Sequence, residues 1–191
     1  MAQVGVSKLF YASYAVNNST VSYSSGAALA KAVNVDIAPE SGDAINFYAD
    51  NAICESAAVF TGGTLTLDID SLSASVAAAL LGLTVDSVST PSGSEIAYKA
   101  GVVAPYLGVG VVFKNIIGGA ESWMGVVLTK VQFQTPELSQ ATQGETIEFT
   151  APQITATIMR DDSADAVWKY EGYFSTEANA VAWIKSKLSI T

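Results

Sequence analysis

Hydrophobic and polar residues alternate with a period of two along much of the chain. This pattern predicts β-strands that have one face in a core and the other against a polar environment. The alternation is clearest at residues 33–38, 64–69 and 154–158. Further strands are predicted at residues 4–14, 105–113, 123–134, 146–149 and 166–170. Gly118-Gly119 and Asp161-Asp162-Ser163 are predicted to be hairpin turns between neighbouring strands.

Two short helices are predicted among the strands. Ser73 can cap a helix over residues 74–81, which Gly82 ends as a left-handed C-terminal residue. A second helix is predicted over residues 176–188, with Thr176 as its cap. Its first turn carries an acidic residue and its end carries lysines, as the helix dipole favours.

Residues 39–63 fit neither the strand period nor the helix period. The segment starts at Pro39, ends at Gly62-Gly63, and contains aromatic and aliphatic residues among acids. Loops of this length are functional or disordered as a rule, and the aromatic content argues against disorder. We therefore expect a long arm between two paired strands, with apolar side chains that something covers; the alternative is a loop that packs on its own domain.

The composition describes one domain with few charges. The 191 residues are 50% hydrophobic and only 14% charged, whereas an ordinary soluble domain has about 25% charged residues. Such a low density of surface charge suggests that part of the surface contacts other protein. The net charge of −9 argues against a nucleic-acid-binding protein that works by neutralising phosphates.

The residue counts also exclude several kinds of chemistry. The absence of histidine excludes Ser/His/Asp and Cys/His triads and His-ligated metal. With Cys54 alone there is neither an internal disulfide nor a thiolate zinc site, and we interpret Cys54 as a small apolar residue. No segment has the length and apolarity of a membrane span, so no membrane association is expected.

The remaining chemical candidates are weak. Residues 161–165 are acidic but lack the glycine and the distal glutamate of an EF-hand, so we interpret them as a turn. Asp68 and Asp70 share a face, and Gly108 and Gly110 lie within an apolar strand that no helix follows. We therefore expect neither an enzyme nor a cofactor.

A series of short motifs runs in one order along almost the whole chain. They are VGVSKLFYA at residues 4–12, YADN at 48–51 with Glu55, Phe60 before Gly62-Gly63, LLG at 80–82, APY at 104–106, Phe133 with Pro136, Thr142 with Gly144, EFTAP at 148–152 with Ile154, Arg160, and Trp168-Lys169. In this order they resemble the phi13-type major tail proteins of siphophages. The C-terminal helix and residues 87–100 match this family least well.

The resemblance implies a mainly β tail-tube fold in a single domain, residues 1–191. The fold would be a β-sandwich with a short flanking α-helix, a long β-hairpin arm at residues 39–63 and a C-terminal helix at residues 176–188. Subunits of this kind form hexameric rings that stack into a hollow tube, and one sheet of each subunit lines the DNA channel. The implied partners are further copies of the chain, the tape measure, tail terminator and distal tail proteins, and phage DNA that passes without specific binding. The implied location is the virion tail, with the host cytoplasm as the place of assembly.

The polar faces of four strands are the expected channel lining, although alternation alone leaves open whether these faces are enclosed or lie outside. These residues are Asn34, Asp36, Thr64, Thr66, Asp68, Gln132, Gln134, Gln153, Thr155 and Thr157. Lys130 is an exception, which we expect either to pair with Asp36 or Asp68 or to lie beyond the channel. The expected contacts of the arm with an adjacent subunit or ring are Phe47, Tyr48, Asp50, Asn51, Ile53, Glu55 and Phe60.

A β-sandwich adhesin, or another surface-binding module, is the competing hypothesis. It accounts equally well for the strands and the acidity. It does not account for the low density of surface charge, the aromatic residues of the arm or the order of the motifs.

Overall fold

The computed structural model describes residues 2–43, 45–49, 52–89, 92–138 and 151–191. This part of the chain is mainly β and carries two helices. The strands are β1 (Ala2–Asn17), β2 (Thr20–Ala28), β3 (Ala32–Ser41), β4 (Ile45–Ala49), β5 (Ala52–Ala57), β6 (Phe60–Ile69), β7 (Val85–Ser89), β8 (Ser92–Ile96), β9 (Tyr106–Ile117), β10 (Ala120–Phe133), β11 (Gln153–Met159) and β12 (Lys169–Phe174). The helices are α1 (Ala74–Leu81) and α2 (Glu177–Lys187).

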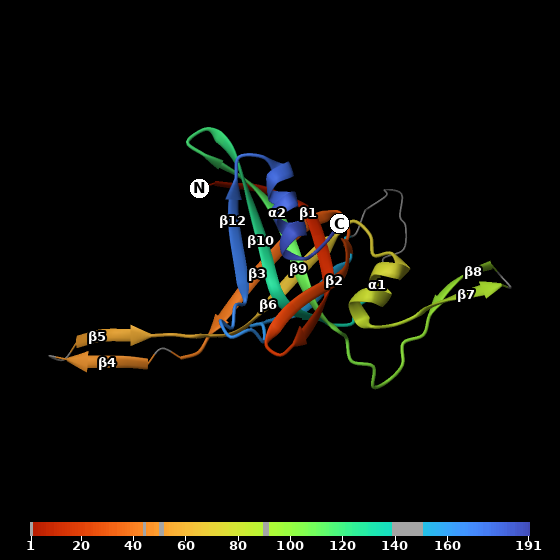
Figure 1. The fold of residues 1–191 in the computed structure, drawn as a ribbon, viewed down its shortest axis with the longest axis horizontal. Coiled ribbons are helices and arrows are strands. Elements are labelled where there is room, and N and C mark those ends of the chain that lie inside the picture. The colour runs from red at the N-terminus through yellow and green to blue at the C-terminus, as the bar shows by residue number, and fades with distance from the viewer. Residues whose placement is uncertain (1, 44, 50–51, 90–91, 139–150) are drawn as a thin grey trace, which may run out of the picture.

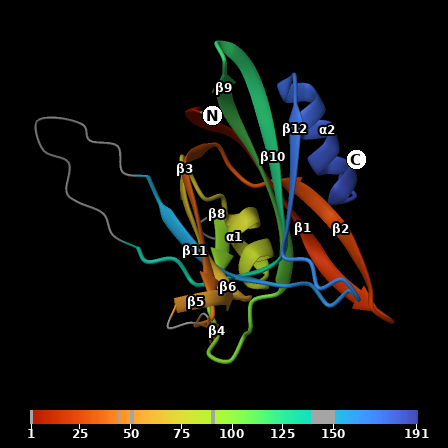
Figure 2. The same ribbon diagram turned by 90° about the vertical axis from the view of Figure 1, so that its left-hand side faces the viewer.

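Antiparallel pairing joins eight strands in the order β2-β1-β9-β10-β11-β6-β3, with β12 as a further partner of β10. The first half of β10 pairs with β12 from Trp123 to Leu128, and the second half pairs with β11 from Lys130 to Phe133. The pairing of β9 with β10 is also irregular between Leu128 and Val131, and such an irregularity bends a strand. Strand β10 therefore passes from one layer to another, with β11, β6 and β3 on one side of the molecule and β1, β2 and α2 on the other (Figure 2).

The main core lies between these two layers. It contains Leu65, Leu67 and Ile69 of β6 and Val109 and Val111 of β9, all fully buried. The alternation predicted at residues 64–69 and 154–158 is confirmed, because every second side chain of both segments is buried.

In residues 33–38 the alternation is confirmed only in part. Val35 and Ile37 pack against the main core, but Val33 is 58% exposed. The register of β3 on β6 shifts between Ala32 and Asn34, which places Val33 in an irregularity of the strand.

Both predicted helices are confirmed with their caps. The Ser73 hydroxyl accepts a hydrogen bond from the Val76 N–H, and Gly82 ends α1 with φ of 70°. The Thr176 hydroxyl accepts from the Asn179 N–H at the start of α2. None of the helices in the described residues has the length and apolar composition needed to cross a bilayer.

Helix α2 covers the face of the sheet that points away from the main core (Figure 1). Ile184 and Leu188 are fully buried there, and glycines of the sheet lie beneath them. A Cβ atom on Gly110 would lie 2.2 Å from Ile184 Cγ2, and one on Gly108 would lie 2.7 Å from Leu188 Cδ2. The two glycines of β9 therefore allow the helix to approach the strand closely.

Two hairpins project from opposite ends of the molecule (Figure 1). Strands β3 and β6 pair as far as Ser41 and Phe60, and β4 with β5 then continues outward as the predicted arm. The second hairpin, β7 with β8, was not predicted.

Other expectations require correction. Asp161-Asp162-Ser163 is not a hairpin turn between paired strands, because β11 and β12 both pair with β10. The strand expected at residues 166–170 begins at Lys169 and extends to Phe174. The strand expected at residues 146–149 lies outside the described residues, and β2 was not predicted.

Candidate functional site

Nine of the ten polar residues predicted as a channel lining lie on β3, β6, β11 and the end of β10, and the tenth, Gln134, directly follows β10. All ten share one face. The neighbouring side chains of each strand point into the main core. Cα register and backbone bonding place the ten in three rows across the strands. The rows are Asn34, Asp68 and Gln153; Asp36, Thr66, Thr155 and Gln134; and Thr64, Thr157 and Gln132.

Hydrogen bonds join several of these side chains. Asp68 accepts a bond from Asn34 Nδ2 at 3.2 Å and from Gln153 Nε2 at 2.9 Å. Thr155 Oγ1 donates to Gln134 Oε1 at 3.4 Å. These contacts hold short neutral and acidic groups against the sheet.

The charge of this polar face is acidic. Its ionisable residues on β3, β6 and β11 are Asp36, Glu40 and Asp68, and these three strands contain neither lysine nor arginine on this face. Cations lie elsewhere: Lys114 forms an ion pair with Glu121 across the β9–β10 hairpin, and Lys187 of α2 lies 4.2 Å from the ring centroid of Tyr170.

Lys130 of β10 pairs with neither Asp36 nor Asp68, so the first of its two expected arrangements is wrong, and its position beyond the channel stays a prediction. Its Nζ atom lies 2.7 Å from Asp162 Oδ2, and 4.4 Å from the ring centroid of Tyr106. Asp162 belongs to the turn after β11, which the sequence does not place near Lys130. Lys130 is the one cation in the strand predicted at residues 123–134, and Asp162 of the same subunit already neutralises its charge.

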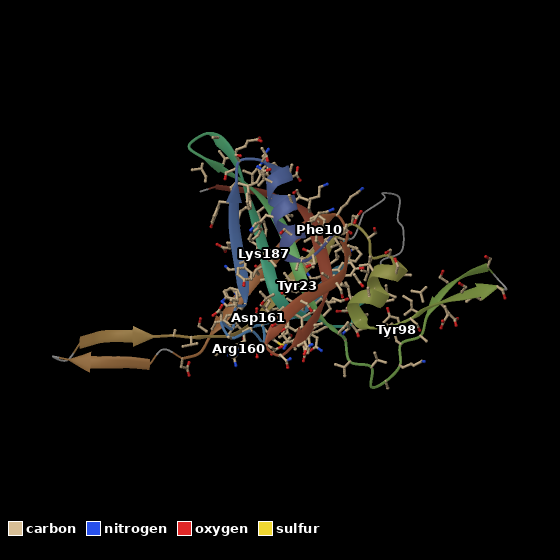
Figure 3. The ribbon with its side chains drawn as sticks, in the orientation of Figure 1. Phe10, Tyr23, Tyr98, Arg160, Asp161 and Lys187 are labelled. Atoms are coloured by element: carbon tan, nitrogen blue, oxygen red, sulfur yellow. The ribbon has the colours of Figure 1, made fainter. Side chains whose placement is uncertain are left out.

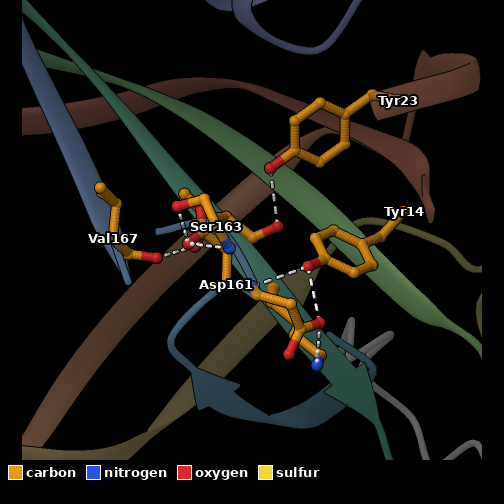
Figure 4. A network of polar contacts seen from close by, with 8 residues as sticks. Tyr14, Tyr23, Asp161, Ser163 and Val167 are labelled. Carbon is orange, nitrogen blue, oxygen red and sulfur yellow. Dashed lines mark hydrogen bonds and ion pairs between the residues drawn. The ribbon is translucent and has the colours of Figure 1, made fainter. Parts of the chain in front are cut away.

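The ion pair belongs to a polar network (Figure 4). Tyr14 donates its hydroxyl hydrogen to Asp162 Oδ2 at 2.8 Å, and its oxygen accepts from the Asp162 N–H at 3.0 Å. Hydrogen bonds from Lys130 and Tyr14 lower the pKa of Asp162. Burial is the main cause that raises the pKa of Tyr14 to about 12, and burial likewise raises the pKa of Tyr23.

The same network holds the point at which β10 changes its partner strand. Thr129 lies between the part of β10 that pairs with β12 and the part that pairs with β11. Its carbonyl accepts from the Tyr23 hydroxyl at 2.8 Å, and its hydroxyl donates to the Val167 carbonyl at 2.7 Å. The geometry therefore indicates a structural role for these residues, which sequence reasoning missed because they are brought together only by the fold.

The acidic segment at residues 161–165 is a local turn in the structure. Asp161 Oδ1 accepts hydrogen bonds from the N–H and the hydroxyl of Ser163, at 3.2 and 2.6 Å. Within the described residues, no group of three or more His, Cys, Asp or Glu side chains is arranged to hold a metal ion.

One of the predicted arm contacts lies outside the β4–β5 hairpin. Phe60 lies at the start of β6, and its ring stacks on Trp168 of the same chain at 4.4 Å between centroids. It is therefore engaged within the subunit. Phe47, Tyr48, Ile53 and Glu55 lie on β4 and β5, but their side chains are outside the described part of the structure, as are Asp50 and Asn51 altogether.

No protein-family model matches the chain, and no curated protein matches it.

Proposed function

We propose that the protein is a tail-tube subunit of a siphophage, which forms hexameric rings that stack into a hollow tube for the passage of DNA. The observation that carries the proposal is the single polar face on β3, β6, β11 and the end of β10. In the proposed tube this face lines the channel. The protein has no catalytic role in this proposal and needs no cofactor.

The chemistry of the face suits a channel through which DNA passes quickly. A cation on the wall would neutralise phosphates and release counterions, which adds to retention of the DNA. The face instead presents Asp36, Asp68 and neutral amides and hydroxyls, and Lys130 is paired with Asp162. DNA therefore meets a wall that repels phosphates or leaves them solvated.

The edges of the sheet favour association with further copies. Strand β3 ends the sheet order on this side, and the described residues supply no strand beyond it. An open strand edge presents unpaired N–H and C=O groups that can pair with another chain. The hairpin β4–β5 also projects without a third strand in the described residues, and a two-stranded hairpin alone is only marginally stable.

In this role the chain would meet the tape measure protein inside the tube and the tail terminator and distal tail proteins at its ends. Its place would be the virion tail, after assembly in the host cytoplasm. These partners and this location rest on the resemblance given above and on the proposed tube.

Electron microscopy of the purified protein tests the proposal directly. We expect rings or tubes, in amounts that rise with protein concentration and with salt, because salt screens the repulsion between subunits of net charge −9. A protein that stays monomeric in light scattering over a wide range of concentration and salt would contradict the tube and favour the adhesin.

A further inference from the structure

The β7–β8 hairpin carries two acids that face each other. Asp86 and Glu95 lie directly opposite on the two strands, and both are exposed. Like charges in this position destabilise a pair of strands. All nine lysines and arginines of the chain lie within the described residues, and the ion pairs found there include neither of these acids. The two carboxylates are therefore available to cations of another molecule.

The side of the sheet that α2 covers, here called the α2 side, is positive although the whole chain is acidic. Four lysines lie on α2 or on the strand faces beneath it: Lys8, Lys114, Lys185 and Lys187. The two on strands are paired in register with Val112 and Trp123, which pack with the helix. The acids of α2 and of these strand faces are Glu121 and Glu177. Lysines thus outnumber acids by two on this side of a chain whose net charge is −9.

Three of the other cations lie close to acids of their own subunit. Lys130 and Lys169 form ion pairs within the subunit, and Figure 3 shows Arg160 beside Asp161. On the α2 side, by contrast, the ammonium of Lys187 lies over the ring of Tyr170, and its side chain is exposed. Copies of net charge −9 repel one another, so a contact between them is favoured where an acidic surface meets a positive one.

We infer that the β7–β8 hairpin of one copy docks on the α2 side of a second copy, where Asp86 and Glu95 meet Lys185 and Lys187. The inference rests on the proposed function, because it names a contact between copies in the tube. Docking offsets the repulsion between the two opposed acids. It also gives a third packing partner to a hairpin whose strands pair only with each other in the described part of the chain.

The positions of the two surfaces suit a contact between different copies. The hairpin lies against α1 at one end of the molecule, whereas α2 packs on β9, β10 and β12 (Figure 1). Two different surfaces of one chain form a heterologous contact, which repeats from copy to copy. Because α2 lies on the other side of the molecule from β3, β6 and β11 (Figure 2), the hairpin would clasp the outside of the tube and leave the channel wall free.

A charge swap tests the contact in the assembling protein. Asp86→Lys with Glu95→Lys makes the net charge less negative than −9, and this change alone should favour assembly. The docking predicts the opposite result. The protein concentration needed for assembly should rise several-fold, because lysines then face Lys185 and Lys187. Addition of Lys185→Glu and Lys187→Glu to the same protein should bring the concentration back toward that of the unmodified protein.

The matched control is Glu137→Lys with Asp165→Lys, which makes the same change in net charge at two exposed positions outside the hairpin. It should lower the concentration needed for assembly or leave it unchanged. Equal rises for the two double variants, or a quadruple variant that assembles no better than the hairpin variant, would overturn the docking. Tubes of the unmodified protein would leave the proposed function intact in that case. An unmodified protein that forms neither rings nor tubes overturns the proposed function and the docking together.

Zero-length cross-linking of the unmodified protein gives a second measurement, which does not depend on how the variants fold. A carbodiimide joins carboxylates to lysines that touch them. In tubes assembled from equal parts of unlabelled and isotope-labelled protein, mass spectrometry shows which links join different copies. We expect links between copies from Asp86 or Glu95 to Lys185 or Lys187. The absence of these links from assembled tubes, or links of the hairpin only to Lys99 of the same copy, would overturn the docking site.

Discussion

Single residues hold the two layers of the sandwich together at the point where β10 changes its partner strand. The Tyr23 hydroxyl donates a hydrogen bond to the Thr129 carbonyl, and the Thr129 hydroxyl donates one to the Val167 carbonyl. Tyr14 and Lys130 converge on Asp162 a short distance away. This concentration of long-range hydrogen bonds predicts that the junction is sensitive to the loss of one hydroxyl.

Removal of the Tyr23 hydroxyl should destabilise the fold. Tyr23→Phe leaves the Thr129 carbonyl without this partner, and such a loss costs about 1–3 kcal/mol. Urea denaturation followed by circular dichroism measures the change in the free energy of unfolding. Tyr98→Phe removes the same group from an exposed ring and should change stability by less than about 0.5 kcal/mol. Equal losses for the two variants would contradict a specific role of Tyr23.

The same tyrosines predict how stability depends on alkaline pH. The folded protein raises the pKa of Tyr14 to about 12 and raises that of Tyr23 as well. Between the ordinary tyrosine pKa of about 10 and the folded values, the unfolded chain loses protons first. Stability is therefore fully present below pH about 10 and falls as pH rises through the folded pKa values. Tyr14→Phe should make this fall less steep in denaturation curves measured between neutral and alkaline pH.

At the scale of elements, α2 depends on glycines that lie beneath it. Gly110→Ala places a Cβ atom 2.2 Å from Ile184 Cγ2, so the helix must move or repack. We expect a loss of about 1–3 kcal/mol, as for other overpacked cores. Gly5→Ala is the matched control, because nothing lies within 4 Å of its added Cβ atom. Thermal unfolding of both variants tests the prediction, and equal melting temperatures would show that α2 tolerates the extra methyl group.

The arm is expected to be dispensable for folding but not for assembly. Its strands β4 and β5 form a separate sheet and pair only with each other in the described residues. A variant in which a short Gly-Ser turn replaces residues 44–57 should still give the circular dichroism spectrum of a β protein. It should also still unfold cooperatively. Rings and tubes should be absent in electron micrographs of this variant. Normal tubes would remove the arm from the assembly contact.

The sequence predicts those elements whose own residues determine their structure. The alternation of Leu65, Leu67 and Ile69 and the caps Ser73 and Gly82 each reflect a local preference, and the structure bears them out. The polar face was predictable too, because alternation fixes the face of each strand before the strand order is known.

Other features depend on contacts between distant segments. Strand β2 is an edge strand with mostly exposed residues, and Ser25 interrupts it with φ of 51°. Lys130 meets Asp162 only because β10 and the turn after β11 cross in space. The β7–β8 hairpin has polar residues on both faces, so its pattern carries no strand period. Local sequence patterns therefore do not determine these elements or this ion pair.

At the scale of the whole molecule, a large surface carries few charges. Only 14% of its residues are charged, and the hairpins β4–β5 and β7–β8 project from its two ends (Figure 1). Acids on the polar face and lysines on α2 are also separated across the sandwich, and this separation gives the proposed tube an acidic interior.

The charge of the channel wall should control the rate of DNA passage. Asp36 is exposed on the polar face and faces Thr66 across the strands, so Asp36→Lys should leave folding and assembly largely intact. Each ring would then present six lysines to the DNA, and contacts with phosphates would slow ejection from virions at low salt. Higher salt should restore much of the rate, because it screens these contacts. Asp165→Lys makes the same charge change in the exposed turn after β11, outside the strands that carry the polar face, and should leave ejection kinetics unchanged. If virions with intact tubes and Asp36→Lys eject DNA at the normal rate in low salt, the polar face does not line the channel.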